Sequence, residues 1–162
     1  MVGAVVLAAG AASRYGSPKQ RLFLPRVVAA LRASSAGEIV VVAGAHELES
    51  DARVVPCPDW QQGPGASLRC GLRAFAASAD AAVVVLADGP DLDPRAVDRV
   101  IEAWHAGSGD VLAATYDGVN RSHPVLLARA AWASVPDGGA RELAVTLVPC
   151  ADLPPPGDVD AP

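Results

Sequence analysis

The N-terminal segment combines a strand-like apolar run with residue types that bind phosphate. Residues 2–7 are apolar and residues 8–13 are small, with Gly10 among them. Arg14 and Lys19 follow this loop. A glycine turn lets backbone N–H groups approach phosphate oxygens, and Arg and Lys add full positive charges. The segment therefore predicts a polyphosphate site.

Neither of the two common phosphate-binding patterns describes this segment. A P-loop requires G-x-x-x-x-G-K-[ST], whereas Gly10 and Gly16 are six positions apart and Pro18-Lys19 follows. A dinucleotide-binding turn requires G-x-G-x-x-G, which Gly10-Ala11-Ala12 does not provide. The predicted phosphate site is therefore of another type.

Carboxylates occur at two places where they could hold a divalent cation. Asp88 follows the strand-like residues 82–86. Asp158 and Asp160 are two positions apart, so an extended segment would turn both to one side. Mg²⁺ prefers one or two carboxylates with waters and phosphate oxygens. The alternatives are that Asp88 only caps a turn and that the tail is solvated.

A glycine-rich element over residues 60–72 leads into a predicted helix. Gly63 and Gly65 allow a close loop, and Ser67 could cap the N-terminus of the helix. Taken alone, the element could be a glycine turn in which Ser67 acts only as the cap.

The residues around these groups alternate between strand-like and helix-like patterns. Apolar runs predict strands buried on both faces, over residues 2–7, 39–43, 82–86, 111–114 and, more weakly, 145–148. Helices are predicted over residues 25–34, 67–77 and 94–106. The last helix would start with Asp93 as N-cap and Pro94 in the first helical position. The alternation predicts an α/β fold with a mostly parallel sheet covered by helices on both sides.

Such a sheet binds its ligands at the carboxyl ends of the strands. The glycine loop and Asp88 each follow a predicted strand, and the chain leads from the strand over residues 111–114 to His123. We therefore expect these groups to meet at one edge of the sheet. We expect a single domain over residues 1–162, in which residues 153–162 form an irregular tail that contributes to the site.

Composition argues against several classes of function. The formal net charge of −5 argues against nucleic-acid binding, and aromatic residues make up only 4% of the chain. No apolar run approaches the length of a membrane-spanning helix, and no basic segment precedes the first run. We therefore expect a cytoplasmic protein with neither a membrane span nor a signal peptide.

The cysteines give no sign of a metal site or a disulfide. Cys57, Cys70 and Cys150 are widely spaced and form no C-x-x-C pair. We expect reduced thiols that are buried or half-buried.

Five segments together resemble one family. The N-terminal segment resembles the nucleotidyltransferase signature L-A-A-G-x-x-x-R-x-G-x-P-K, matched at Leu7, Ala8, Ala9, Gly10, Arg14, Gly16, Pro18 and Lys19. Four more segments resemble W-x-x-G-x-x-x-S-L-R-x-G-L (60–72), H-P-V-L (123–126), G-D-x-G-A-R (137–141) and D-I-D-T-P (158–162). These segments resemble those of the MobA-like NTP transferases, most closely the molybdenum cofactor cytidylyltransferases.

The resemblance implies a three-layer Rossmann-like nucleotidyltransferase fold. It implies that an acceptor phosphate attacks the α-phosphorus of a nucleotide and that pyrophosphate leaves. The form Leu7-Ala8-Ala9-Gly10 favours CTP as the nucleotide. The acceptor would be phosphorylated, such as molybdopterin or molybdenum cofactor, the metal would be Mg²⁺, and a cofactor-receiving enzyme would be a further partner.

The same resemblance implies roles for individual residues. Arg14, Lys19 and Asp88 would be catalytic, and Asp88 and Asp160 would bind the metal. His123 and Arg141 would bind the acceptor, although a lone His is often structural and an exposed Arg is often only solvated. The nucleotide would lie against Leu7, Ala8, Ala9, Gly10, Arg14, Lys19, Gly63, Ser67 and Asp88.

Departures from the family pattern keep two other functions open. Gly89 replaces the glutamine of the D-Q-P motif, and the segments 20–38 and 132–148 are shorter than usual. The chain could be a nucleotidyltransferase for a sugar phosphate or another small metabolite. It could also be a nucleotide- or cofactor-binding protein without turnover.

Overall fold

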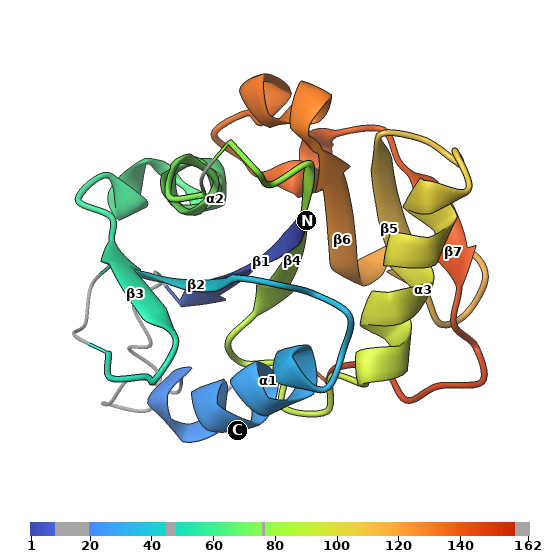
Figure 1. Cartoon of the computed structure of the whole chain (residues 1–162), viewed down its shortest axis with the longest axis horizontal. Coiled ribbons are helices and arrows are strands. Elements are labelled where there is room, and N and C mark those ends of the chain that lie inside the picture. Colours follow the sequence, from blue (N-terminus) through green and yellow to red (C-terminus); the bar gives the residue numbers. More distant parts are fainter. Residues whose placement is uncertain (9–19, 45–47, 76, 158–162) are drawn as a thin grey trace.

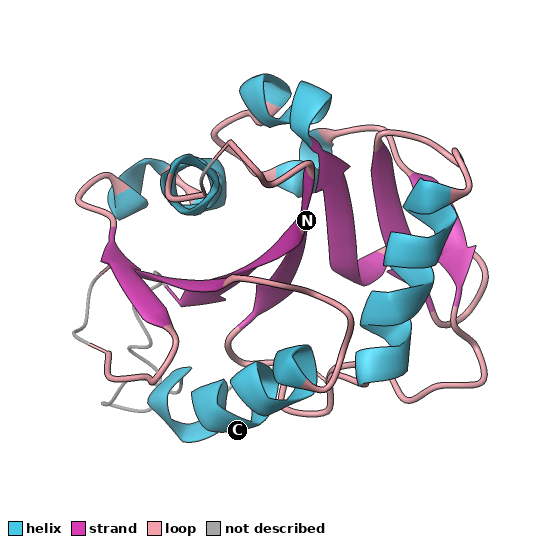
Figure 2. Ribbon diagram, in the orientation of Figure 1, coloured by secondary structure: helices cyan, strands magenta, loops and turns pink. Residues whose placement is uncertain are grey.

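The computed structural model describes residues 1–8, 20–44, 48–75 and 77–157. Within them the strands form a seven-stranded sheet in the order β3-β2-β1-β4-β6-β5-β7 (Figures 1 and 2). The strands are β1 (Val2–Ala8), β2 (Ile39–Ala43), β3 (Arg53–Pro56), β4 (Ala81–Leu86), β5 (Val111–Thr115), β6 (Ser122–Ala128) and β7 (Thr146–Pro149).

Most neighbouring strands are parallel, as the sequence predicts. β1 pairs in parallel with both β2 and β4, and the pairs β2–β3 and β5–β7 are parallel as well. β6 runs antiparallel to β4 and β5. Leu7 of β1 is opposite Leu86 of β4, so the carboxyl ends of these two strands lie together.

Helices cover both faces of the sheet, which gives three layers. α1 (Gln20–Arg32) and α3 (Pro94–His105) pack on one face, and α2 (Pro64–Arg73) packs on the other (Figure 1). Short 3-10 turns accompany them: η2 (Trp60–Gln62), η3 (Arg129–Ser134) and η4 (Ala140–Glu142). No helix in the described ranges combines the length and the apolar character needed to cross a bilayer.

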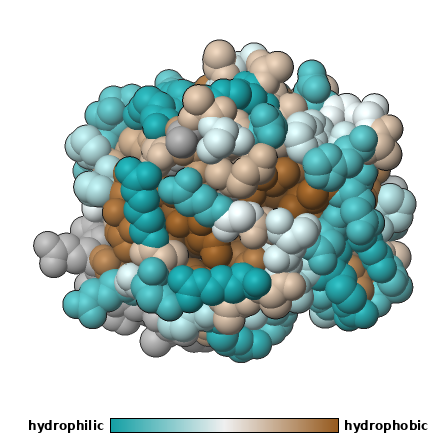
Figure 3. Space-filling model, viewed as in Figure 1, coloured by the Kyte–Doolittle hydropathy of each residue, from teal (hydrophilic) through white to brown (hydrophobic). Residues whose placement is uncertain are grey.

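The central strands contribute side chains to two cores, one on each face. In β1, Ala4 and Val6 pack toward α1 and α3, whereas Val5 packs toward α2. Because both faces are covered, these strands are apolar at nearly every position instead of at alternate positions. Figure 3 shows apolar residues (brown) across the middle of one face, between hydrophilic residues (teal).

Helix α3 forms as the sequence predicts. Asp93 Oδ1 accepts a hydrogen bond of 2.8 Å from the backbone N–H of Arg95, and Pro94 lies in the first turn. The helix buries an apolar face that includes Val97 and Val100. The cap and the apolar spacing therefore fix both the start of this helix and the face it turns to the sheet.

The sequence does not predict β3 and β6. β3 is short, lies at the edge of the sheet and has exposed ends at Arg53 and Pro56. β6 contains Pro124, which is more typical of a loop. The β5–β6 register shifts between Ala113 and Ala114, opposite this part of β6. A proline fits at such an irregularity because its missing N–H costs no regular ladder hydrogen bond there.

Helices α1 and α2 begin earlier than predicted. α1 starts at Gln20, so Pro25 lies inside the helix. α2 starts at Pro64, whose missing N–H is tolerated in the first turn, and Gly63 is its N-cap. The prediction that Ser67 caps this helix is therefore wrong, because Ser67 lies inside α2 and is buried.

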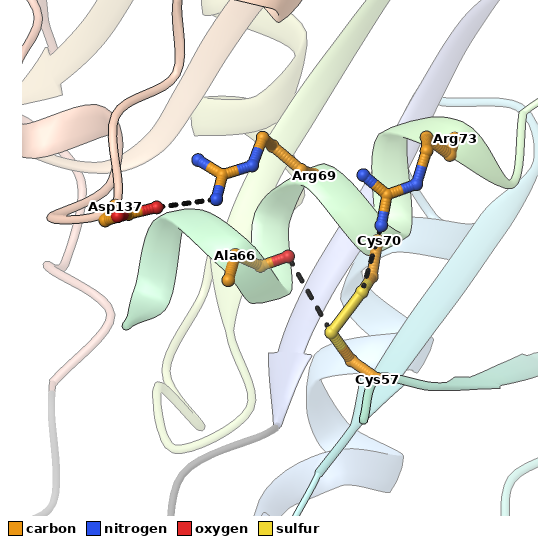
Figure 4. Close-up of a disulfide and its surroundings, with 6 residues drawn as sticks. All are labelled: Cys57, Ala66, Arg69, Cys70, Arg73 and Asp137. Atoms are coloured by element: carbon orange, nitrogen blue, oxygen red, sulfur yellow. Dashed lines mark hydrogen bonds and ion pairs between the residues drawn. A yellow bond between two sulfur atoms is a disulfide. The ribbon is translucent and has the colours of Figure 1, made fainter. Parts of the chain in front are cut away.

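Two of the three cysteines form a disulfide, contrary to the prediction. Cys57 follows β3 and Cys70 lies in α2, and their Cα atoms are 5.9 Å apart across a sequence separation of 13 (Figure 4). The sequence could not show the pairing because it depends on α2 folding back over the end of β3. Cys150 is a free, buried thiol, as predicted.

Candidate functional site

The candidate site lies where β1 and β4 end. Ala8 is the last residue of β1, and α1 begins at Gln20. The predicted phosphate-binding residues Ala9, Gly10, Arg14 and Lys19 belong to the segment between these two elements and lie outside the described residues. Their roles stay predictions.

A pocket of about 400 Å³ opens beside these strand ends, on the face of the sheet that α2 covers. This volume is within the range of small-molecule sites. The strands β1, β4 and β6, the start of α2, and residues 138–141 all contribute to its walls. It is lined by Leu7, Pro64, Leu68, Val84, Leu86, Arg121, Ser122, His123, Val125, Gly138, Gly139, Ala140 and Arg141.

The pocket wall from residue 135 to 143, the 135–143 loop, lies directly against the start of α2. Gly65 N donates a hydrogen bond of 2.9 Å to the carbonyl oxygen of Asp137. A Cβ atom at Gly65 would overlap the carbonyl of Pro136, and one at Gly63 would overlap that of Asp137. Gly63 also has φ = 128°, a conformation that other residues rarely adopt. Packing against the 135–143 loop therefore requires glycine at both positions. From the sequence, only a close loop is expected there.

Two arginines hold the 135–143 loop from either side. Arg69 donates to Val135 O at 2.9 Å. It also donates to the carboxylate of Asp137 at 2.6 Å, the interaction drawn in Figure 4. Arg121 donates to the carbonyl oxygens of Arg141 at 2.8 Å, Ala140 at 3.2 Å and Leu143. A guanidinium group suits this task because it presents several donors in one plane. The sequence did not single out Arg121, because its acceptors lie about twenty residues further along the chain.

His123 lies at the start of β6, beside the end of β4. Val84 is opposite Val125 in the antiparallel ladder, and Leu86 and His123, just beyond this pair, both line the pocket. Burial lowers the pKa of His123 to about 4, and the negative charge of Asp88 opposes this shift only in part. His123 is therefore neutral at pH 7, so it can both donate and accept a hydrogen bond in the pocket.

Asp88 lies in the turn after β4, half-buried and within electrostatic reach of His123. The end of the described chain packs against the same turn. Asp91 N donates to Pro156 O at 2.9 Å, and a Cβ atom at Gly89 would lie 3.1 Å from Pro156 Cβ, so the two residues are close. Residues 156–157 therefore lie beside the segment that follows Asp88, while Asp160 itself is outside the described residues.

The described protein side chains alone do not form a complete metal site here, so a bound metal ion would also need water or substrate ligands. The described residues contain no group of three or more His, Cys, Asp or Glu side chains that could hold a metal ion. Asp88 alone still fits Mg²⁺, which takes one or two carboxylates and fills its other positions with water and phosphate oxygens.

The structure brings together some of the predicted residues and separates others. Leu7, His123 and Arg141 line the same pocket, and Asp88 lies near His123. Arg141 is exposed, and within the described ranges its guanidinium has no hydrogen-bond or ion-pair partner. Ser67 is buried in α2, and its neighbour Leu68 lines the pocket instead.

The three-layer fold and a pocket at the carboxyl ends of parallel strands define an α/β protein whose ligand site lies at the strand ends. The chain belongs to the MobA-like NTP transferase family, because the model of the MobA-like NTP transferase domain matches residues 4–144. Family membership makes the protein an NTP transferase. It confirms the predicted family, fold class and enzyme class.

Solved structures share this fold. Rv0371c from Mycobacterium tuberculosis H37Rv is 22% identical, with a TM-score of 0.77 over 92% of this chain and 87% of that one. Rv0371c has also been solved in complex with manganese, at 21% identity and a TM-score of 0.77 over 98% and 92% of the two chains. A nucleotidyl transferase from Methanothermobacter thermautotroptrophicus (Mth528) is 24% identical, with a TM-score of 0.70 over 86% and 78%.

A more distant structure has a nucleotide bound. CMP:2-keto-3-deoxy-manno-octonic acid synthetase, complexed with CTP, is 15% identical, with a TM-score of 0.59 over 70% of this chain and 51% of that one. At these identities the likenesses establish the fold alone. Among curated proteins, none matches the chain.

Proposed function

We propose that the protein transfers CMP from CTP to a phosphorylated acceptor such as molybdopterin or molybdenum cofactor. An oxygen of the acceptor phosphate attacks the α-phosphorus of CTP, a new P–O bond forms, and the bond to pyrophosphate breaks. The observation that carries the proposal is the 400 Å³ pocket, which joins the end of β1 to His123 and Arg141. Catalysis of this kind needs alignment and charge neutralisation, and needs no covalent intermediate on the protein.

The nucleotide half of the site is proposed to lie at the end of β1. Leu7 and Ala8 lead into the segment that carries Gly10, Arg14 and Lys19. The two cationic side chains would offset charge on the α-phosphate and on the leaving pyrophosphate. Gly63 and Ser67 are expected near the base from the sequence. Because Ser67 is buried in α2, contact with the base from this element would come through its neighbours Pro64 and Leu68, which line the pocket. Support for CTP comes from the Leu7–Gly10 residues and from the CTP complex of the synthetase that shares the fold.

The acceptor half is proposed to lie between β6 and the 135–143 loop. Arg141 is exposed at the pocket and could bind a phosphate with two parallel hydrogen bonds. Neutral His123 could donate a hydrogen bond to the same ligand without adding a charge. Arg121 would act indirectly, because it holds the backbone from which Arg141 projects.

Asp88 and Asp160 are the proposed ligands of a divalent cation, with Mg²⁺ as the expected ion. A bound cation would polarise phosphate oxygens and orient the two substrates. The turn at Asp88 and the chain at residues 156–157 are in contact, which supports a contribution from the tail. The manganese complex of Rv0371c supports a divalent cation in this fold.

A sugar phosphate is the second candidate for the acceptor. The synthetase that shares the fold is named for a sugar acid, which favours this alternative over other metabolites. Both candidates use the same nucleotide half and the same chemistry. They differ only in what fills the pocket lined by His123 and Arg141.

A substrate screen tests the proposal. The purified protein is mixed with CTP, GTP or ATP, with molybdopterin or a sugar phosphate, and with Mg²⁺ or EDTA, and pyrophosphate release is followed. We expect the fastest release with CTP, molybdopterin and Mg²⁺. Release with a sugar phosphate but not with molybdopterin would favour the second candidate. No release with any combination of nucleotide and acceptor would contradict both candidates.

A cytoplasmic location, a single domain over residues 1–162 and a cofactor-receiving enzyme as partner are further proposals. The location has an observation against it, because cytosolic proteins are normally kept free of disulfides and Cys57 is bonded to Cys70. Quenching cells in acid and then alkylating the thiols of the denatured protein decides this point, because both cysteines are buried in the fold. Two alkylated cysteines at 57 and 70 would show a reducing location, and none would show an oxidising one.

A further inference from the structure

A second cavity, separate from the substrate pocket, lies between α2 and η3. Its volume is about 330 Å³, and among the described residues that line it three are arginines and none is acidic. We call it the arginine pocket, and its residues are Arg69, Leu72, Arg73, Phe75, Arg129, Trp132 and Ala133. Its size suits a small molecule rather than a protein surface.

The floor of the arginine pocket is apolar and aromatic. Leu72 and Phe75 are buried, and the ring centroids of Phe75 and Trp132 are 6.2 Å apart. The indole N–H of Trp132 donates to Leu127 O at 3.0 Å, which fixes the orientation of the ring. Because Phe75 is buried, the half-buried Trp132 is the aromatic ring of the pocket that a ligand can contact.

The rim of the pocket is positively charged, and each guanidinium has a defined position. The guanidinium carbon of Arg129 lies 4.6 Å from the ring centroid of Trp132. Arg69 is held by the 135–143 loop, and Arg73 donates to the sulfur of Cys70 at 3.5 Å. Figure 4 shows Arg69 and Arg73 projecting to the same side of α2, as their four-residue spacing requires.

The positive charge of the arginines at the rim favours an anionic ligand. The residues that line the cavity carry three formal positive charges and no negative one, in a chain whose formal net charge is −5, but two of these arginines have a carboxylate nearby. Asp137 pairs with Arg69, and Asp80 lies close enough to Arg129 for the two charges to interact. Arg73 lines the cavity and donates to the sulfur of Cys70, and no carboxylate of the described residues pairs with its guanidinium.

We propose that the arginine pocket binds a small aromatic anion, with its ring against Trp132 and its phosphate or carboxylate against Arg73 and Arg129. Arg69 connects this site with the 135–143 loop. A ligand that draws Arg69 away from Asp137 would therefore loosen a wall of the substrate pocket.

Phenyl phosphate is the probe that tests the proposal, because it combines a ring with an anion. Binding is followed by the NMR shift of the Trp132 indole N–H, assigned with Trp132→Phe. We expect saturable binding of phenyl phosphate. Benzyl alcohol lacks the charge and inorganic phosphate lacks the ring, so each should bind at least about tenfold more weakly. Equal binding of either control compound would overturn the proposal.

Matched variants locate the binding. Arg73→Gln should weaken phenyl phosphate at least about tenfold, and Arg73→Lys, which keeps the charge, should retain most of the affinity. Arg32→Gln on α1 removes an exposed arginine of the opposite layer and should have no effect. Arg141→Gln removes a cation from the substrate pocket and should leave the Trp132 shift unchanged. Unchanged affinity in Arg73→Gln, or loss in Arg141→Gln alone, would place the probe elsewhere and end the proposal.

Discussion

At the scale of the residue, His123 shows how burial sets the chemistry of a side chain. Its pKa is lowered to about 4 because burial in the pocket wall removes much of the water around the ring. The unfolded chain has the ordinary value near 6.5, so it takes up protons that the folded protein resists. The stability that His123 contributes is therefore complete above about pH 6.5 and is lost as the pH falls toward 4.

Replacing His123 should remove that pH dependence. We expect wild-type protein in EDTA to lose up to about 3 kcal/mol of unfolding free energy to this residue between pH 7 and pH 4. The His123→Gln variant should lose less unfolding free energy than the wild type between pH 7 and pH 4, by about the same amount. Urea unfolding at several pH values measures the difference, with exposed His105→Gln as the control. Parallel curves for the wild type and His123→Gln would disprove the assignment.

Single residues also show where sequence reasoning stops. Asp88 and His123 could be placed near one another because both follow predicted strands. Arg121 could not be recognised, since its function is to bind three carbonyl groups of the 135–143 loop. Nothing in the residues around Arg121 indicates partners that only the folded chain brings within reach.

At the scale of the element, the fit between α2 and the 135–143 loop depends on glycine. Gly65→Ala would place a methyl group into the carbonyl of Pro136, so backbone must move. We expect a loss of about 1–3 kcal/mol, the usual cost of overpacking. Gly138→Ala in the same loop is the control, because its new methyl group meets the movable side chain of Glu142. Chemical unfolding of both variants compares them, and equal stability of the two would contradict this account.

The disulfide joins the same region to β3. It closes a loop across a sequence separation of 13, for which the chain-entropy model gives about 3 kcal/mol. A reducing agent should therefore destabilise the wild type by roughly this amount and leave the double variant Cys57→Ser, Cys70→Ser unaffected. Thermal unfolding with and without reductant measures both. Identical curves for the wild type in the two conditions would show that the bond is absent or contributes nothing.

At the scale of the whole molecule, the layered architecture could be predicted and the sheet order could not. Continuous apolar runs identify β1, β2 and β4, since only strands covered on both faces need them. β6 starts with polar residues and a proline, so local sequence patterns do not predict that this strand lies between β4 and β5. That insertion is what places His123 beside the end of β4.

The central claim is that the protein transfers a nucleotide at the strand ends around Asp88. The most direct measurement is pyrophosphate release from CTP, molybdopterin and Mg²⁺ by the wild type and by Asp88→Asn, paired with the melting temperature of each. We expect turnover to fall by about a hundredfold or more in the variant, since a charged group acting on phosphates is lost. The melting temperature should stay the same or rise. A variant that is destabilised but still turns over at the wild-type rate would contradict the account, because Asp88 would then only support its turn.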